Sequence, residues 1–111
     1  MSLLIASLAL IATQQATKPV PVKPQTWLTN DDYPRAALRA GQQGVVSFRL
    51  DVGADGKVVT CTVTVSSGYQ VLDDATCAIM KKRALFKPAR DGKGVPIPFS
   101  WSSRFTWELP N

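Results

Sequence analysis

The sequence contains no histidine, and this absence limits the chemistry that the chain can perform. Histidine is the commonest general base near neutral pH and the commonest neutral metal ligand. No glycine-rich phosphate loop and no serine elbow stand in its place. The adjacent Asp73 and Asp74 diverge by about 100° on a helix, so they cannot form a catalytic carboxylate pair. We therefore expect a binding protein that is not an enzyme and that holds no metal and no cofactor.

The sequence also lacks an apolar run long enough to cross a bilayer, which takes about 20 residues. The main run, Leu3–Ala12, has ten residues and is followed by small and polar ones. This pattern is typical of an export signal, which we place at residues 1–16. No Lys or Arg precedes the run, so a short or truncated membrane anchor and a misassigned start codon stay as alternatives. We expect a periplasmic protein, either exported or anchored at the inner membrane.

Charged residues are few, at 19% of the chain, and the net charge is +5. Six of the cations lie between residues 81 and 93: Lys81, Lys82, Arg83, Lys87, Arg90 and Lys93. Such a basic loop can bind nucleic acid or an anionic surface. Cations at a helix C-terminus that run into a solvated loop are the simpler explanation. We expect no nucleic-acid partner, and we keep binding of acidic polymers or lipid surfaces as the alternative function.

Proline gathers near the start of the chain, at Pro19, Pro21 and Pro24. Proline at this density favours the polyproline II conformation, so the sequence predicts a stiff, solvated linker over residues 17–30. At about 3.1 Å per residue, residues 18–25 reach roughly 25 Å. Trp27 is apolar and could pin this linker to the domain that follows. We place that domain at residues 31–111, enough chain for one domain but not for two.

Turn and capping residues divide the domain into five elements. Pro34 and Gly41 mark the start and stop of a short helix over 34–40. Apolar and polar residues alternate over 46–52 and 59–65, and an Asp-Gly turn between them predicts an antiparallel hairpin. Residues 72–85 carry apolar side chains at helical spacing, with acids in the first turn and cations in the last. A final amphipathic strand is predicted over 99–109.

These elements predict an α+β fold, a three-stranded antiparallel sheet with helical cover on one face, in the order α-β-β-α-β. The third strand reaches the first by a right-handed crossover from the second. Cys61 then points from the second strand toward the main helix, in which Cys77 lies. Two cysteines in a small exported chain are expected to form a disulfide, and two buried free thiols are the alternative.

The aromatic side chains Trp101, Phe105 and Trp107 share one face of the last predicted strand. Aromatic residues at a spacing of two more often form the core face of a strand than a ligand platform. We therefore assign this stripe to the core of the domain.

The order of short motifs over residues 31 to 109 resembles the C-terminal domain of the TonB family of energy transducers. The motifs that carry the resemblance are Tyr33-Pro34 with Ala37-Leu38, Gly44–Phe48, Val52–Val58, Ser66-Ser67-Gly68, Leu72-Asp73 and Arg83–Ala89. Their order and spacing together are more specific than any one of them. The resemblance implies a periplasmic domain that binds a short extended segment of an outer-membrane transporter, or of another periplasmic protein.

In this family, binding resembles the addition of a strand to the edge of the last strand of the sheet. An exposed strand edge offers unpaired N–H and C=O groups to an incoming segment. The resemblance therefore implies a partner-binding edge, and it adds the Tyr-Pro element. The expected binding residues are Ser100, Trp101, Ser102, Ser103, Arg104, Phe105, Thr106 and Trp107, with Tyr33 and Pro34.

The sequence departs from the family pattern at its N-terminus. Family members couple to a proton-driven motor through a membrane-spanning helix with polar residues that include a histidine, and neither feature occurs here. The proline-rich segment is also short, at roughly 25 Å. We therefore expect partner binding in support of transmembrane transport, rather than energy transduction by this chain alone. An open sheet also allows a homodimer through swapped or paired edges.

Overall fold

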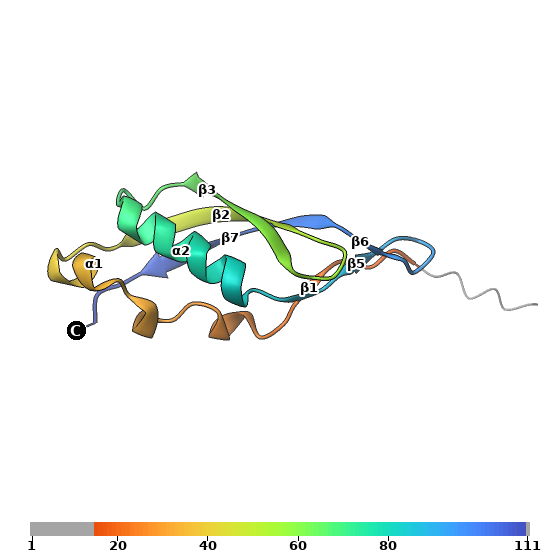
Figure 1. Ribbon diagram of the computed structural model, residues 1–111, viewed down its shortest axis with the longest axis horizontal. Coiled ribbons are helices and arrows are strands. Elements are labelled where there is room, and N and C mark those ends of the chain that lie inside the picture. The colour runs from red at the N-terminus through yellow and green to blue at the C-terminus, as the bar shows by residue number, and fades with distance from the viewer. Residues whose placement is uncertain (1–14, 111) are drawn as a thin grey trace, which may run out of the picture.

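The computed structural model describes residues 15–110 of the chain. The predicted export signal, residues 1–16, lies outside the described residues except for its last two. The elements follow the predicted order α-β-β-α-β, with short additions (Figure 1). They are β1 (Val20–Pro21), η1 (Pro24–Thr26), η2 (Asn30–Asp32), α1 (Arg35–Arg39), β2 (Gly44–Val52), β3 (Val58–Val65), α2 (Gln70–Arg83), β4 (Phe86–Lys87), β5 (Ala89–Arg90), β6 (Pro96–Ile97) and β7 (Phe99–Trp107), where η1 and η2 are 3-10 helices.

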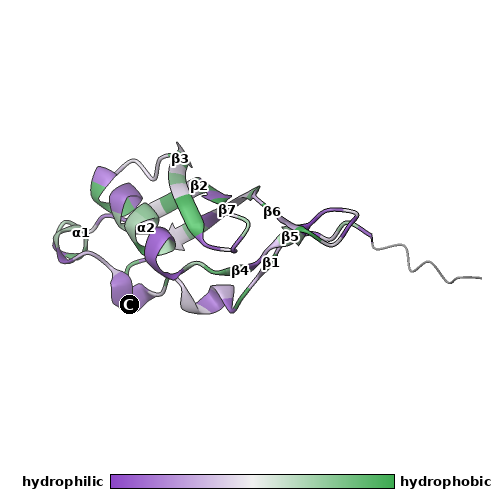
Figure 2. Ribbon diagram, turned by 45° about the vertical axis from the view of Figure 1, so that its right-hand side comes forward, coloured by the Kyte–Doolittle hydropathy of each residue, from purple (hydrophilic) through white to green (hydrophobic). Residues whose placement is uncertain are grey.

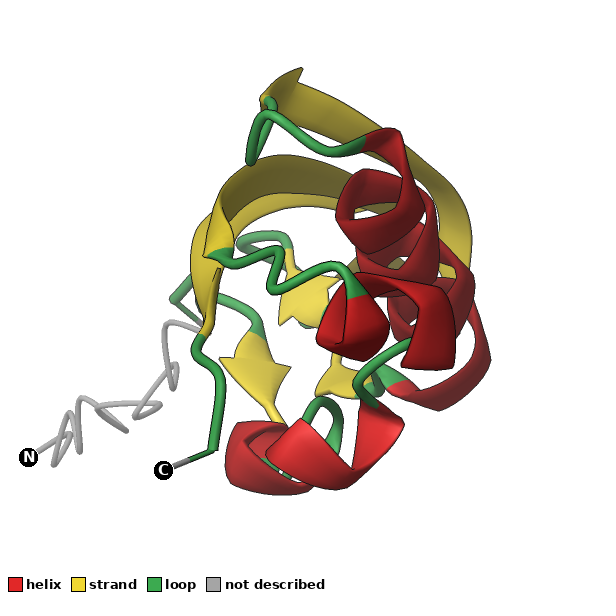
Figure 3. Ribbon diagram, turned by 90° about the vertical axis from the view of Figure 1, so that its left-hand side faces the viewer, coloured by secondary structure: helices red, strands yellow, loops and turns green. Residues whose placement is uncertain are grey.

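The main sheet has three antiparallel strands in the order β3-β2-β7, which confirms the predicted fold class. Strand β2 lies in the centre, and it pairs with β7 in an unbroken register from Gly44 opposite Trp107 to Val52 opposite Phe99. Helix α2 packs mainly against β3 and β2. Seen end-on, the sheet curves over the helices, so one face is covered and the other is open (Figure 3).

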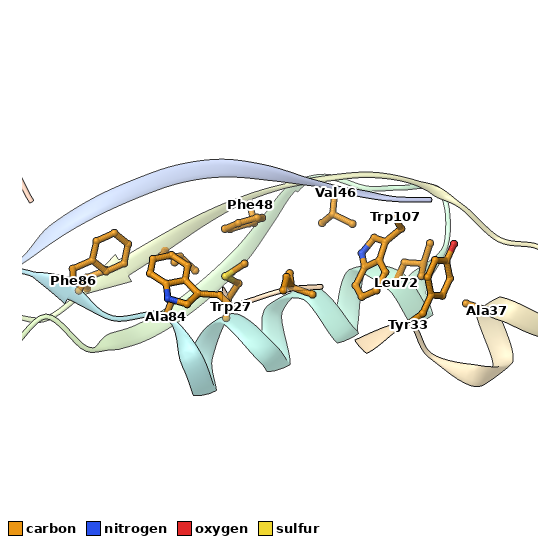
Figure 4. Close-up of a cluster of buried hydrophobic side chains, with 13 residues drawn as sticks. Trp27, Tyr33, Ala37, Val46, Phe48, Leu72, Ala84, Phe86 and Trp107 are labelled. Atoms are coloured by element: carbon orange, nitrogen blue, oxygen red, sulfur yellow. The ribbon is translucent and has the colours of Figure 1, made fainter. Parts of the chain in front are cut away.

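The core fills the space beneath this curve. Side chains from β2, including Phe48 and Leu50, are almost fully buried and belong to the same hydrophobic cluster as Leu72 of α2. Trp107 at the end of β7 is also fully buried, and its indole N–H donates to Thr76 Oγ1 at 2.9 Å. Figure 4 shows that these side chains meet residues from the N-terminal part of the chain. The core thus brings together the sheet, helix α2 and the N-terminal part of the chain, which the hydrophobic pattern of the sequence alone does not link.

The predicted hairpin is present, but β3 contains two bulges that the sequence analysis did not predict. The alternation predicts that Val59 and Val65 face the core, but they are 64% and 61% exposed. The register with β2 shifts once between Asp51 and Val52 and once between Ser47 and Phe48, so β3 carries an extra residue at each place. An extra residue reverses which side chains face the core. Cys61 and Val63, which lie between the bulges, do pack against the core as predicted.

The predicted disulfide is present between Cys61 of β3 and Cys77 of α2. Their Cα atoms lie 5.5 Å apart and the residues are 16 apart in sequence. The bond ties the outer strand of the sheet to the helix that covers it. In the chain-entropy model, closing a loop of this length stabilises the fold by roughly 3 kcal/mol.

The segment from Thr17 to Leu28 is not a solvated linker, contrary to the sequence prediction. Thr17 exchanges two backbone hydrogen bonds with Arg90, and β1 pairs with β4. Figure 2 shows β1 lying along β4 and the β5–β6 hairpin. Trp27 and Leu28 are only 3% and 6% exposed. Proline does not prevent this docking because two-residue strands at an edge need few N–H donors. We call residues 17–28 the N-terminal strap.

Asp73 joins the loop after β3 to the first turn of α2. Its carboxylate accepts hydrogen bonds from the hydroxyls of Ser66 and Ser67 and from the Ser67 N–H. Burial alone would raise the pKa of Asp73, but these hydrogen bonds outweigh it, and the pKa is lowered. An acid in the first turn also suits the helix dipole. The serine pair is therefore held in place by a charged acceptor.

Reduction of the disulfide should lower the melting temperature of the protein by more than about 10 °C, since roughly 3 kcal/mol is lost. Thermal unfolding with and without dithiothreitol measures the effect. The matched control is the double variant Cys61→Ala with Cys77→Ala, whose melting temperature should not change when the reductant is added. An unchanged melting temperature of the fully reduced wild type would contradict a stabilising role for the disulfide.

Asp73→Asn should lower the free energy of unfolding by about 1–3 kcal/mol at pH 7, because a charged acceptor is lost from three hydrogen bonds. The carboxyl has a folded pKa below its unfolded value of about 3.9. Its stabilisation is therefore present above pH 4 and is lost as pH falls through the folded pKa. Urea titrations at pH 7 and pH 3 should show the difference between the variant and the wild type shrinking. A constant difference would refute the assignment.

Candidate partner-binding edge

The residues expected at the binding edge form one continuous strand, β7. Exposure alternates along it: Ser100, Ser102, Arg104 and Thr106 are exposed, whereas Trp101, Ser103 and Phe105 are half-buried and Trp107 is buried. This alternation matches the predicted core stripe. Among the described residues, β7 pairs with β2 alone, so its other edge is the outer edge of the sheet.

The hairpin turn shows which backbone groups of β7 face outward. The N–H of Gly53 donates to Lys57 O at 2.9 Å, so residue 53 directs its backbone toward β3. Successive residues of a strand alternate in this direction, and β2 runs against β7 without a register shift. Leu50 and Val52 therefore direct their backbones at β7. It follows that their partners Trp101 and Phe99 face β2, whereas Ser100, Ser102, Arg104 and Thr106 direct N–H and C=O groups away from the sheet.

The opposite edge of the sheet, on β3, is covered at its start and irregular along its length. Lys57 forms a bridge with Leu85, and the Phe86 N–H donates to Gly56 O at 3.0 Å, so the segment before β4 covers the start of β3. Gly56 permits this approach, because it has φ +81° and a Cβ there would lie 2.0 Å from Phe86 O. The two bulges and the disulfide further distort and tether β3. Bulges and covering segments are common protections of edge strands, so β7 is the regular, open edge.

The N-terminal strap supports the inner face of β7. The Trp27 ring lies 5.9 Å from that of Trp101 and 5.3 Å from that of Phe86, between centroids. Its indole N–H donates to Val22 O at 3.0 Å, so the ring is fixed within the strap. Arg83 of α2 donates to Trp27 O and pairs with Asp32 at 2.9 Å. The edge strand thus rests on a segment that the sequence analysis assigned to the linker.

Tyr33 and Pro34 lie beneath the C-terminal end of β7. Tyr33 is 6% exposed, its ring contacts that of Trp107 at 5.1 Å, and its hydroxyl donates to Gln42 O. Burial raises the pKa of Tyr33. Pro34 is half-buried and precedes α1. The structure therefore brings both residues to one end of the edge, where Tyr33 holds Trp107 rather than presenting its ring to solvent.

A row of hydrogen-bonded polar side chains, centred on Asp51, crosses the open face of the sheet. Its carboxylate accepts hydrogen bonds from Thr60 of β3 and Ser100 of β7, both at 2.7 Å, and Arg49 lies 3.7 Å away. The hydrogen bond from Thr60, then that from Ser100, lowers the pKa of Asp51. Its role as a cross-strand acceptor depends on the register, which sequence alone does not give.

The basic loop does not form one surface of free cations. Arg83 is engaged with Asp32 and Trp27, and Arg90 donates to Gly94 O at 2.8 Å. Lys87 lies in β4 beside the strap. The structure therefore divides the six cations among the end of α2, β4 and the β5–β6 hairpin.

The fold and the open edge define a class of protein: a small α+β domain with an antiparallel sheet and one regular strand edge available for pairing. Comparison with known families assigns the chain more narrowly. Residues 29–109 match the family model of the Gram-negative bacterial TonB protein C-terminal, and the chain belongs to this family. The match confirms the resemblance predicted from the short motifs.

One relative of the chain is Protein tonB2 of Pseudomonas aeruginosa, which is 36% identical over 75 residues. The match covers 61% of this chain and 27% of the relative, so the chain spans about a quarter of that protein. Within residues 15–110, no helix is both long and apolar enough to cross a membrane.

Replacing Trp27 by Ala should lower the free energy of unfolding by about 3–5 kcal/mol, because a buried ring beneath β7 is lost. Chemical denaturation measures the change. Val45→Ala on the exposed face of β2 is the matched control and should change stability by less than about 0.5 kcal/mol. If both variants were equally stable, the strap would not be part of the folded unit.

Proposed function

We propose that the chain is a periplasmic binding module that pairs by strand addition with an extended segment of an outer-membrane transporter or another envelope protein. Through this pairing it supports transport across the outer membrane. The guest segment lies along the outer edge of β7 and continues the sheet as a fourth strand. Tyr33 and Pro34 border the end of that edge.

The open edge of β7 is the observation that carries the proposal. A run of nine residues without a bulge or proline, whose outer edge pairs with no other segment of residues 15–110, is unusual, because such edges promote aggregation. Only Arg104 supplies a protecting charge within β7. An edge of this kind is consistent with one that is kept regular to accept a guest strand.

Family membership supports the class of partner and the compartment. A TonB C-terminal domain occurs with an export signal expected at residues 1–16, and the Cys61–Cys77 disulfide is typical of an oxidising compartment. The proposal is limited to partner binding, because the chain spans 27% of its relative Protein tonB2. We propose no catalytic step.

The alternative function, contact with acidic polymers or lipid surfaces through the basic loop, gains no support. Its cations Arg83 and Arg90 are engaged in contacts within the domain. Strand pairing depends on backbone hydrogen bonds and should depend little on salt, whereas a charge-driven contact should weaken steeply.

Ser102→Pro should weaken guest binding at least about tenfold, because it removes an N–H group that faces outward while sparing the ladder with β2. Binding can be measured by calorimetry with synthetic peptides that tile the periplasm-facing segments of outer-membrane transporters from the same cell. Ser102→Ala keeps the N–H group and is the matched control, expected to bind within about twofold of the wild type.

Circular dichroism and the melting temperature should show that both Ser102 variants remain folded. Undiminished binding by a folded Ser102→Pro variant would show that the guest does not pair with β7.

A further inference from the structure

Arg104 is the one cation on β7, and it takes part in neither of the two ion pairs found among residues 15–110. Its side chain lies on the open face of the sheet, opposite Ser47 of β2, and is exposed. No hydrogen bond from its guanidinium to another described residue is present, whereas Arg49 and Arg83 each have a carboxylate partner. The centre of the open edge therefore carries an unbalanced positive charge.

The surroundings of Arg104 supply no balancing negative charge next to it. Arg49 lies diagonally across from it, because Arg49 pairs with Ser102 in the register. Along β7, the neighbours on the same face are the neutral Ser102 and Thr106. Negative charge appears only farther away in both directions, at Asp51 next to Ser100 and at Glu108 beyond the end of the strand. The edge thus presents a positive centre between two carboxylates, of which Asp51 is paired with Arg49.

A guest strand must place one side chain beside Arg104. Residues opposite each other on neighbouring strands project to the same face, with Cβ atoms about 4.5–5.5 Å apart. This holds for a parallel or an antiparallel guest. A residue of the guest that faces Arg104 therefore lies within reach of its guanidinium, and a carboxylate there can form a charge-assisted pair.

We propose that Arg104 selects guest segments that carry a single Asp or Glu opposite it, flanked on the same face by neutral or basic residues. Acidic residues opposite Ser100 or near Glu108 are disfavoured, because they meet Asp51 or Glu108. Opposite charges directly across a ladder favour pairing, and like charges oppose it. This inference rests on the proposed function, since it names the chemistry of the segment that pairs with β7.

The test is selection of a phage-displayed library of random seven-residue peptides on the full chain and on its Arg104→Glu variant. The wild type should enrich Asp or Glu at one fixed position of the aligned peptides. The variant should enrich Lys or Arg at that same position. Lys82→Glu, which changes the net charge equally at the exposed end of α2, is the matched control and should select the wild-type pattern.

Titration of one selected peptide and its neutral Gln or Asn version then gives the size of the effect. The acidic peptide should bind the wild type about two- to fivefold more tightly than its neutral version, and this preference should reverse with Arg104→Glu. Enriched sequences without a fixed acidic position, or with the same one for Arg104→Glu, would overturn this inference alone. If Ser102→Pro selected the same peptides as the wild type, the proposed function would fail as well.

Discussion

The ladder between β2 and β7 is the interaction on which the rest of the account depends. Its register runs unbroken from Gly44 opposite Trp107 to Val52 opposite Phe99, so each residue of β7 has a defined backbone direction and a defined face. One set of residues forms backbone hydrogen bonds with β2 and directs its side chains toward the core. The other set is Ser100, Ser102, Arg104 and Thr106. Their backbone N–H and C=O groups point away from β2, and their side chains lie on the open face of the sheet. A guest strand would meet both kinds of group at the same four positions.

The two edges of the sheet differ because different parts of the chain hold them. Strand β3 is bulged, bridged at Lys57 by Leu85 and tied to α2 by the disulfide. Strand β7 is held from beneath by Trp27 and Tyr33, and within the described part of the chain nothing pairs with its outer side. The N-terminal strap is therefore a structural partner of the binding edge. The strap and the edge strand are in direct contact through the rings of Trp27 and Trp101.

The sequence predicted the elements well and their long-range relations only in part. Period-2 patterns located β2 and β7, and two cysteines on expected faces located the disulfide. The bulges in β3 were missed, because Val59 and Val65 continue an apolar alternation that only the register interrupts. The docking of the strap was missed because proline favours the same extended backbone in a free linker and in an edge strand. The direction of each backbone group of β7 required the hydrogen bond between Gly53 and Lys57.

Amide hydrogen exchange along β7, followed by NMR, tests the central claim most directly. If the outer edge is open, the amides of Ser102 and Arg104 should exchange rapidly in the free protein, whereas those of Ser103 and Phe105, which face β2, should be protected. Addition of a guest peptide should slow exchange at Ser102 and Arg104. Equal protection of all four amides in the free protein would mean that the outer edge is already paired and would contradict the account.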